Sequence, residues 1–172
     1  MNTFKICLIG GPYTGKTSFI HRHQTGQFLT DYVPTKGVDV HSLVLKTDVG
    51  QYCLKVWDTA GQQQLKVLGD AYYLQSDAAI AFYTSDSIDL TKQCVKDFIR
   101  VEDTAPIINV WNKTDLPDEY QFVKRMERTV NSTILQGRRS TYQVSGKSNY
   151  NCEKPFLEIL RQLTKNPQLQ FI

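Results

Sequence analysis

A phosphate-binding loop is predicted at Gly10 to Ser18, GGPYTGKTS, which has the spacing G-x-x-x-x-G-K-[ST]. Gly10 and Gly15 would let the backbone curl around phosphate oxygens, and a helix starting behind the loop would add its N–H groups and its dipole. Lys16 would reach the β- and γ-phosphates, and Thr17 would bind Mg²⁺ through its hydroxyl. The alternative is a plain glycine turn. We disfavour it because a strand is predicted before the motif and a helix after it.

A second candidate group is WDTAGQ, residues 57–62. Asp58 ends a predicted strand, where its carboxylate could serve Mg²⁺, and Gly61 offers a backbone N–H to the γ-phosphate. Gln62 could orient an attacking water, because its amide both donates and accepts hydrogen bonds. An aspartate at a strand end is often structural, but one that follows a phosphate loop is better explained as a metal ligand.

Base recognition is predicted at NKTD, residues 112–115. The Asp115 carboxylate could accept two hydrogen bonds from the N1–H and N2–H₂ edge of guanine, a donor pair that adenine lacks. The stem of Lys113 could cover the base, and Asn112 could brace the phosphate loop. After the last predicted strand, SGKS would close the pocket through backbone N–H groups and Lys147. Alone, each tetrapeptide is no more than a turn, so the prediction rests on their order along the chain. The predicted base-site residues are Asn112, Lys113, Asp115, Ser145, Gly146 and Lys147.

Two further residues could complete the site. Phe28, after the first predicted helix, could stack edge-on against the base, although a phenylalanine is also a common core residue. Thr35 lies in YVPTKGV, a stretch that Pro34 and Gly37 should keep from being helical. A threonine in a mobile loop can bind Mg²⁺ and the γ-phosphate only while that phosphate is present, which makes a switch. Its alternative is a plain loop hydroxyl.

Alternating strand and helix patterns must position these residues. Strands are predicted at 4–10, 38–47, 51–58, 77–84, 105–112 and 140–145, and helices at 16–23, 91–101, 119–131 and from 155 onwards. The second and third strands flank the turn at Asp48 to Gly50 and should form a hairpin. We therefore predict one α/β domain over residues 1–172, with a six-stranded, mostly parallel sheet flanked by about five helices.

The composition fits a globular protein, with 41% hydrophobic and 22% charged residues. A net charge of +3, with scattered basic residues, gives no reason to expect nucleic acid as a partner. The four cysteines form no C-x-x-C pair and are expected to be reduced. The sequence shows no secretory signal, no membrane-length apolar run and no prenylation box, so we expect no membrane anchor and a location in the cytoplasm or nucleus.

The motifs together resemble the Ras superfamily of small GTPases over nearly the whole chain, and within it the Ran family. The segments that carry the Ran resemblance are RHQTGQF (22–28), GVDVH (37–41), VWDTAGQ (56–62), YYLQSDAAI (72–80), SNYNCEKPFL (148–157) and NPQLQF (166–171). The fold implied is the P-loop NTPase fold of a G domain.

The Ran resemblance implies a monomeric switch that binds GTP or GDP with Mg²⁺ and hydrolyses GTP slowly. Its partners would be transport receptors of the importin-β class, an exchange factor and a GTPase-activating protein, and its role would be nucleocytoplasmic transport. Phosphate contacts would come from the backbone of Tyr13 and of Gly15 to Ser18, with Thr14 in the same loop. Tyr32 would help to position Gln62. The implied catalytic residues are Gln62, Lys16, Thr35 and Tyr32, and the implied metal ligands are Thr17, Thr35 and Asp58.

The sequence also departs from the Ran pattern. Gln63-Gln64-Leu65 replaces Glu-Lys-Phe, Lys36 replaces a leucine, and the base loop has S-G-K in place of S-A-K. The chain is a few residues longer around 126–139, and it ends at Ile172 without the C-terminal switch helix and acidic tail. These departures bear mainly on the partners.

Pro12 leaves two functions open. The resemblance implies that the phosphates do not use the N–H at this position, so nucleotide binding should survive the proline. Its ring would nevertheless crowd the γ-phosphate where many activating proteins insert an arginine. The alternative to an active GTPase is therefore a guanine-nucleotide-binding scaffold with little or no hydrolysis. A P-loop kinase is disfavoured, because the sequence has nothing that resembles a lid or an acceptor site.

Overall fold

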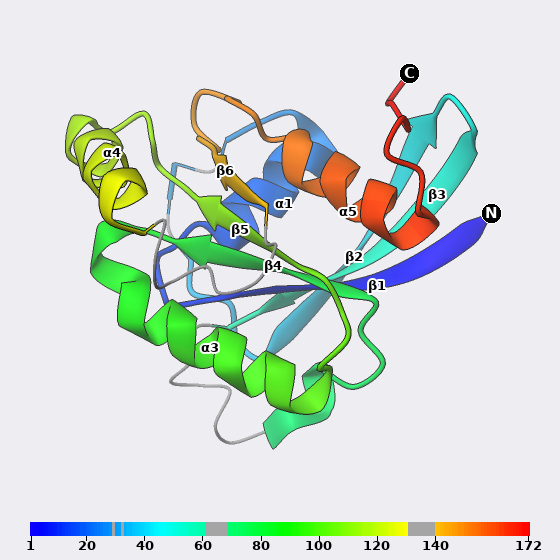
Figure 1. Ribbon diagram of the computed structural model, residues 1–172, viewed down its shortest axis with the longest axis horizontal. Coiled ribbons are helices and arrows are strands. Elements are labelled where there is room, and N and C mark those ends of the chain that lie inside the picture. The colour runs from blue at the N-terminus through cyan, green and yellow to red at the C-terminus, as the bar shows by residue number, and fades with distance from the viewer. Residues whose placement is uncertain (29, 32, 61–68, 131–139) are drawn as a thin grey trace.

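The computed structural model describes residues 1–28, 30–31, 33–60, 69–130 and 140–172 (Figure 1). Its strands are β1 (Asn2–Gly10), β2 (Val38–Thr47), β3 (Gly50–Thr59), β4 (Ala78–Tyr83), β5 (Ile107–Trp111) and β6 (Thr141–Gln143). Its α-helices are α1 (Lys16–Thr25), α3 (Ile88–Val101), α4 (Pro117–Val130) and α5 (Lys154–Thr164), and two short 3₁₀ helices are η1 (Gly69–Tyr72) and η2 (Ser85–Ser87).

The six strands form one sheet in the order β2-β3-β1-β4-β5-β6. The β2–β3 pair is antiparallel, joined by the predicted turn, and all other neighbours are parallel. The predicted six-stranded, mostly parallel sheet is confirmed. Among the described residues four α-helices flank it, which are the four whose positions the sequence predicted.

Two apolar layers bury the sheet, one on each face. On one face, α1 and α5 contribute Phe19, Phe156 and Ile159 to a core with β1, β3, β4 and β5. On the other face, Phe98 of α3 and Val123 of α4 pack against β1, β4 and β5. Figure 1 shows α1 and α5 together on one side of the sheet and α3 on the opposite side. Burial on both faces explains the unbroken apolar runs of β1, β4 and β5, which are typical of parallel strands.

The predicted site residues follow the carboxyl ends of central strands. The phosphate loop leaves β1 after Gly10, Asp58 is near the end of β3, and Asn112 directly follows β5. β3 and β1 are neighbours, and β4 alone separates β1 from β5. The carboxyl ends of these parallel strands therefore lie close together, along the carboxyl-terminal side of the sheet. Open α/β sheets bind ligands at the carboxyl ends of their strands.

Two further features of the structure concern its cysteines and the length of its helices. All four cysteines are buried and free, as expected for reduced thiols. Within the described part of the chain, no helix has the length and apolar character needed to cross a membrane.

Candidate nucleotide-binding site

The loop between β1 and α1 has a backbone that two glycines permit. Gly10 has φ 147°, and a Cβ there would lie 2.6 Å from the Phe82 carbonyl oxygen. Gly15 has φ 88°, and a Cβ there would collide with the Asn112 side-chain amide. Tyr13 also has a positive φ of 60°, which is uncommon for a residue with a side chain, and the residue is 63% exposed. The loop is therefore a tight concave turn whose tyrosine ring projects outward.

Helix α1 aims its N-terminus into this turn. Its first intrahelical bond runs from the Phe19 N–H to the Gly15 carbonyl at 2.9 Å. The N–H groups before Phe19, those of Lys16, Thr17 and Ser18, therefore have no partner within the helix. Such groups, together with the helix dipole, make a ready anion site. Three of the backbone donors predicted for the phosphates, those of Lys16, Thr17 and Ser18, thus lie together at the start of α1.

Lys16 lies beneath the loop with only 6% of its surface exposed. Its Nζ donates to the carbonyl oxygens of Gly10 at 3.1 Å and Gly11 at 2.9 Å, and it lies 3.4 Å from the Thr14 hydroxyl. The Thr14 hydroxyl in turn donates to the Gly11 carbonyl at 2.9 Å. The ammonium group is therefore held inside the turn that the backbone donors surround.

Three oxygen-bearing side chains from three segments meet beside Lys16. The Thr17 hydroxyl donates to Asp58 Oδ2 at 2.6 Å and lies 2.8 Å from the Thr35 hydroxyl. The Thr35 hydroxyl is 3.5 Å from the same carboxylate oxygen. The second oxygen, Asp58 Oδ1, is buried and has no hydrogen-bond partner among the residues that the structure describes. The three residues that the sequence predicts as metal ligands thus come together.

This cluster fits a magnesium ion. Mg²⁺ takes oxygen ligands at about 2.1 Å in an octahedron, so adjacent ligands are about 3 Å apart. The three oxygen–oxygen separations, 2.8 Å for Thr17–Thr35, 2.6 Å for Thr17–Asp58 and 3.5 Å for Thr35–Asp58, lie on either side of that value. A cation here would also satisfy the buried Asp58 Oδ1, which is unpartnered within the described residues. Groups of three or more His, Cys, Asp and Glu side chains able to hold a metal do not occur in the described ranges.

Burial dominates the electrostatics of this cluster. It lowers the pKa of Lys16, while the charge of Asp58 acts in the opposite direction. It raises the pKa of Asp58, against the Thr17 hydrogen bond and the charge of Lys16. Both groups lie where water solvates a charge poorly, so a phosphate beside Lys16 and a divalent cation beside Asp58 would each offset a desolvation cost.

Asn112 joins the phosphate loop to the segment after β6. Its Nδ2 donates to the Thr14 carbonyl at 2.8 Å, and its Oδ1 accepts from the Gly146 N–H at 3.4 Å. The side chain is 3% exposed, so both contacts are shielded from water. A buried amide with a partner at each end holds two loops in a fixed relation.

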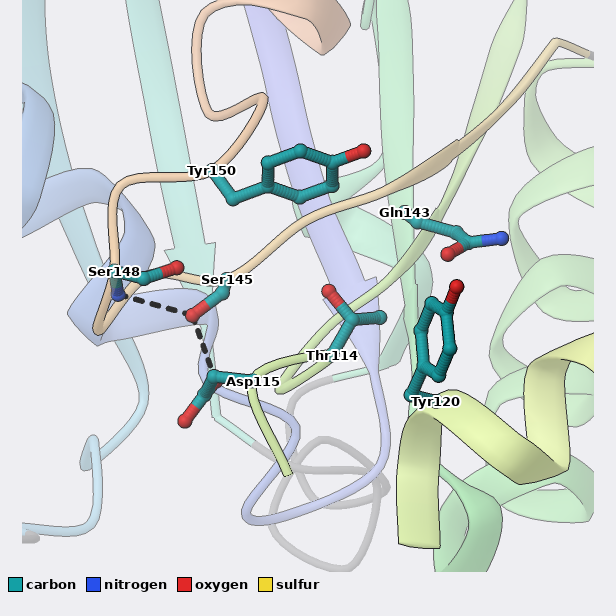
Figure 2. A pocket seen from close by; sticks show the side chains of 7 residues that line it. All are labelled: Thr114, Asp115, Tyr120, Gln143, Ser145, Ser148 and Tyr150. Atoms are coloured by element: carbon teal, nitrogen blue, oxygen red, sulfur yellow. Dashed lines mark hydrogen bonds between the residues drawn. The ribbon is translucent and has the colours of Figure 1, made fainter. Parts of the chain in front are cut away.

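Asp115 and the loop from Ser145 to Ser148 form one wall of a pocket (Figure 2). The Ser145 hydroxyl donates to Asp115 Oδ1 at 2.6 Å and accepts from the Ser148 N–H at 3.0 Å, so it fixes the carboxylate and the loop together. The lining residues are Thr114, Asp115, Tyr120, Gln143, Ser145, Ser148 and Tyr150. Figure 2 shows the two tyrosines and Gln143 on the side of the pocket away from Asp115.

Phe28, Lys113 and Lys147 surround the same loops. The Phe28 ring lies next to Gly146, where an added Cβ would be 4.0 Å from its Cε2 atom. Lys113 has φ 62° and lies between the buried Asn112 and the exposed Asp115. Lys147 is exposed. Three predicted site residues, Tyr32, Gly61 and Gln62, and the divergent patch Gln63-Gln64-Leu65 lie outside the described residues.

Sequence reasoning missed Thr91, which anchors the phosphate loop. Its hydroxyl accepts from the Gly11 N–H at 3.1 Å and donates to the Phe82 carbonyl at 2.8 Å. The side chain is fully buried at the start of α3. A threonine in the first turns of a helix has many explanations, and no local pattern indicates a partner 80 residues earlier in the chain.

The fold and the site define a P-loop nucleotide-binding protein with a G-domain arrangement. A comparison with protein families agrees: the model of the Ras family matches residues 5–165, and the chain belongs to this family. Proteins of the Ras family are small GTPase switches that bind GTP or GDP with Mg²⁺ and hydrolyse GTP. They generally work with exchange factors and GTPase-activating proteins.

Proposed function

We propose that this protein is a Ran-like GTP/GDP switch of nucleocytoplasmic transport, with slow intrinsic GTP hydrolysis. The observation that carries the switch is the meeting of Thr17, Thr35 and Asp58 beside the buried Lys16. Thr17 belongs to the phosphate-loop helix, Asp58 to β3 and Thr35 to a connecting loop. A ligand at this point therefore acts on three segments together.

The proposed roles follow from the chemistry of each side chain. Lys16 and the N–H groups at the start of α1 bind the phosphate oxygens. Thr17, Thr35 and Asp58 hold Mg²⁺, which when bound neutralises the charge that develops on the phosphates. The Asp115 carboxylate selects guanine, and Phe28 and Lys113 flank the base. Gln62 orients the attacking water, and Tyr32 supports Gln62.

Thr35 gives the switch its physical basis. Thr35 lies in a segment, residues 33–36, that has no regular secondary structure, and its hydroxyl contacts Thr17 and Asp58 outside that segment. The same segment is tied to the end of β3 by the bond from the Ala60 N–H to the Gly37 carbonyl at 2.9 Å. Contacts of Thr35 with a γ-phosphate and Mg²⁺ would order this segment, and loss of the phosphate would release it.

The Ran-type role rests on the sequence segments that carry the Ran resemblance, two of which lie at the end of α1 and beside β2. RHQTGQF covers the end of α1, and NPQLQF runs beside β2, where Phe171 forms a bridge with Thr47. We propose receptors of the importin-β class, an exchange factor and a GTPase-activating protein as partners, with the protein in both nucleus and cytoplasm. The chain would act as a monomer.

The nucleotide itself provides the first test. Chromatography of nucleotide released from the purified protein should yield GDP or GTP, and excess GTP but not ATP should displace it. Asp115→Asn should weaken GTP binding and admit xanthosine triphosphate, because an amide donates where the carboxylate accepts. Equal competition by ATP and GTP against the wild type would contradict the assignment of Asp115.

A further inference from the structure

Arg22, in the last turn of α1, joins two parts of the molecule that are far apart in sequence. One terminal nitrogen donates to the Gly26 carbonyl at 2.6 Å, and the other donates to the Lys147 carbonyl at 2.8 Å. The backbone adds a third link, because the Gly26 N–H donates to the Arg22 carbonyl at 2.8 Å. Arg22 Nε is buried, whereas the bonds of its two terminal nitrogens lie at the exposed surface between the end of the helix and the loop after β6.

Lys147 lies in the loop that faces the proposed guanine site. Its neighbours in that loop are already held from the inner side: Gly146 by Asn112, and Ser145 by Asp115 (Figure 2). Arg22, on α1, binds the same loop at the Lys147 carbonyl, which is 125 residues further along the chain. Phe28, on the segment that Gly26 begins, packs beside Gly146. The two terminal nitrogens of Arg22 therefore hold both the base loop, residues 145–148, and the start of the segment that carries Phe28.

We propose that Arg22 is a positioning residue for guanine recognition, an inference that rests on the proposed nucleotide binding. Its guanidinium ties the helix that carries the phosphate donors to the loop that closes over the base. The rigid fork of arginine serves two carbonyls at once, whereas a lysine ammonium at this position could not reproduce that planar geometry. The side-chain hydrogen bonds of Arg22 in the described structure go to Gly26 and Lys147 and not to the phosphate loop, so we expect its effect on nucleotide retention and not on cleavage.

A matched control separates this role from general support of the fold. Arg161, near the end of α5, also donates through its guanidinium to a backbone carbonyl, that of Leu169 at 2.9 Å. It is partly buried like Arg22, and its bond lies away from the base loop. Arg161→Ala therefore removes an arginine–carbonyl contact without altering the base loop.

The test measures release of a fluorescent GDP from the full chain after addition of excess GDP. We expect Arg22→Ala to release it about tenfold faster, the effect of losing roughly one charge-assisted hydrogen bond, with Arg22→Lys between Ala and wild type. Arg161→Ala should stay within about twofold of wild type. Single-turnover hydrolysis of preloaded GTP should be unchanged in Arg22→Ala, because the phosphate contacts remain.

Release at the wild-type rate in Arg22→Ala would overturn the positioning role, and so would an equal acceleration in Arg161→Ala. Full rescue by Arg22→Lys would show that charge alone matters and would also overturn it. A wild-type chain that retains no GDP would contradict the proposed function and the inference with it. Wild-type retention with unchanged variants would contradict the inference alone.

Discussion

At the scale of single residues, the contact between Gly15 and Asn112 shows how closely the two halves of the site approach. Asn112 reaches the Thr14 carbonyl only because position 15 has no side chain. The positive φ at Gly15 adds a second reason for glycine, since residues with a Cβ are strained there. Gly146 differs: it has no positive φ, and an added Cβ would meet only the Phe28 ring at ordinary contact distance.

Two alanine substitutions should therefore behave differently. Gly15→Ala should weaken GDP binding by at least about tenfold, because the methyl group displaces Asn112 and the backbone strain costs on the order of 1 kcal/mol. Gly146→Ala, the matched control on the facing loop, should bind GDP within about threefold of wild type. Titration with a fluorescent GDP measures both. Comparable losses in the two variants would show that the close approach at Gly15 has no special importance.

At the scale of elements, α1 packs against α5 through an aromatic cluster that includes a histidine. His23 lies between Phe19 and Phe156, with ring centroids 4.6 and 4.8 Å away. Its Nδ1 is 2.9 Å from the Phe19 carbonyl. Burial lowers the pKa of His23, and this effect outweighs the Phe19 and Cys152 carbonyls and the charge of Glu153, which act in the opposite direction. The folded protein therefore favours the neutral ring.

The stability of the fold should fall as the pH is lowered past the pKa of His23 in the unfolded chain, about 6.5. Below that value the unfolded state binds a proton that the folded state resists, so acid favours unfolding. Above it both states hold a neutral ring, and His23 contributes no pH dependence. Urea unfolding at about pH 7.5 and about pH 5.5 measures the change. His23→Gln, which cannot titrate, should show a smaller loss, and an equal loss in both proteins would contradict this account.

The elements themselves could be predicted because their signals are local. The β2–β3 hairpin was predicted from two apolar patterns and the turn at Asp48 to Gly50, and β2 begins and ends where predicted. β5 and β6 are shorter at both ends than the predicted ranges 105–112 and 140–145, because the residues that flank them in sequence do not join the paired strands. The site residues that could be predicted belong to motifs with fixed spacing. Thr91 and Arg22 could not be, because their partners are backbone atoms brought close only by the folded sheet.

At the scale of the whole molecule, the residues of the candidate site come from segments spread along most of the chain and lie at the carboxyl ends of the parallel strands. The loop with Thr35 follows α1 and leads directly into β2, which lies at the edge of the sheet. A change in the conformation of the Thr35 loop can therefore alter the surface around β2 without a rearrangement of the core. This arrangement suits a protein whose partners distinguish the GTP form from the GDP form.

Receptor binding should accordingly depend on the nucleotide. The chain loaded with a non-hydrolysable GTP analogue should bind an importin-β-class receptor at least about tenfold more tightly than the GDP form, a coupling typical of such switches. Thr35→Ala should remove most of this difference, whereas Thr30→Ala, an exposed threonine in the same connection, should keep it. Pull-down at matched concentrations measures the ratio. Equal binding of both nucleotide forms by the wild type would contradict a switch for this partner.

Single-turnover GTP hydrolysis tests the central claim, an active switch, most directly. The wild type should hydrolyse GTP at a rate on the order of 10⁻⁴ s⁻¹, the intrinsic scale of small GTPases. Gln62→Leu should lower the rate clearly while leaving nucleotide affinity nearly unchanged, because the attacking water is no longer oriented. Pro12→Gly should change the rate by only a few-fold, because position 12 supplies no phosphate donor. A wild type as inert as Gln62→Leu, with turnover restored by Pro12→Gly, would show that the proline has disabled the enzyme and that the protein is a nucleotide-binding scaffold.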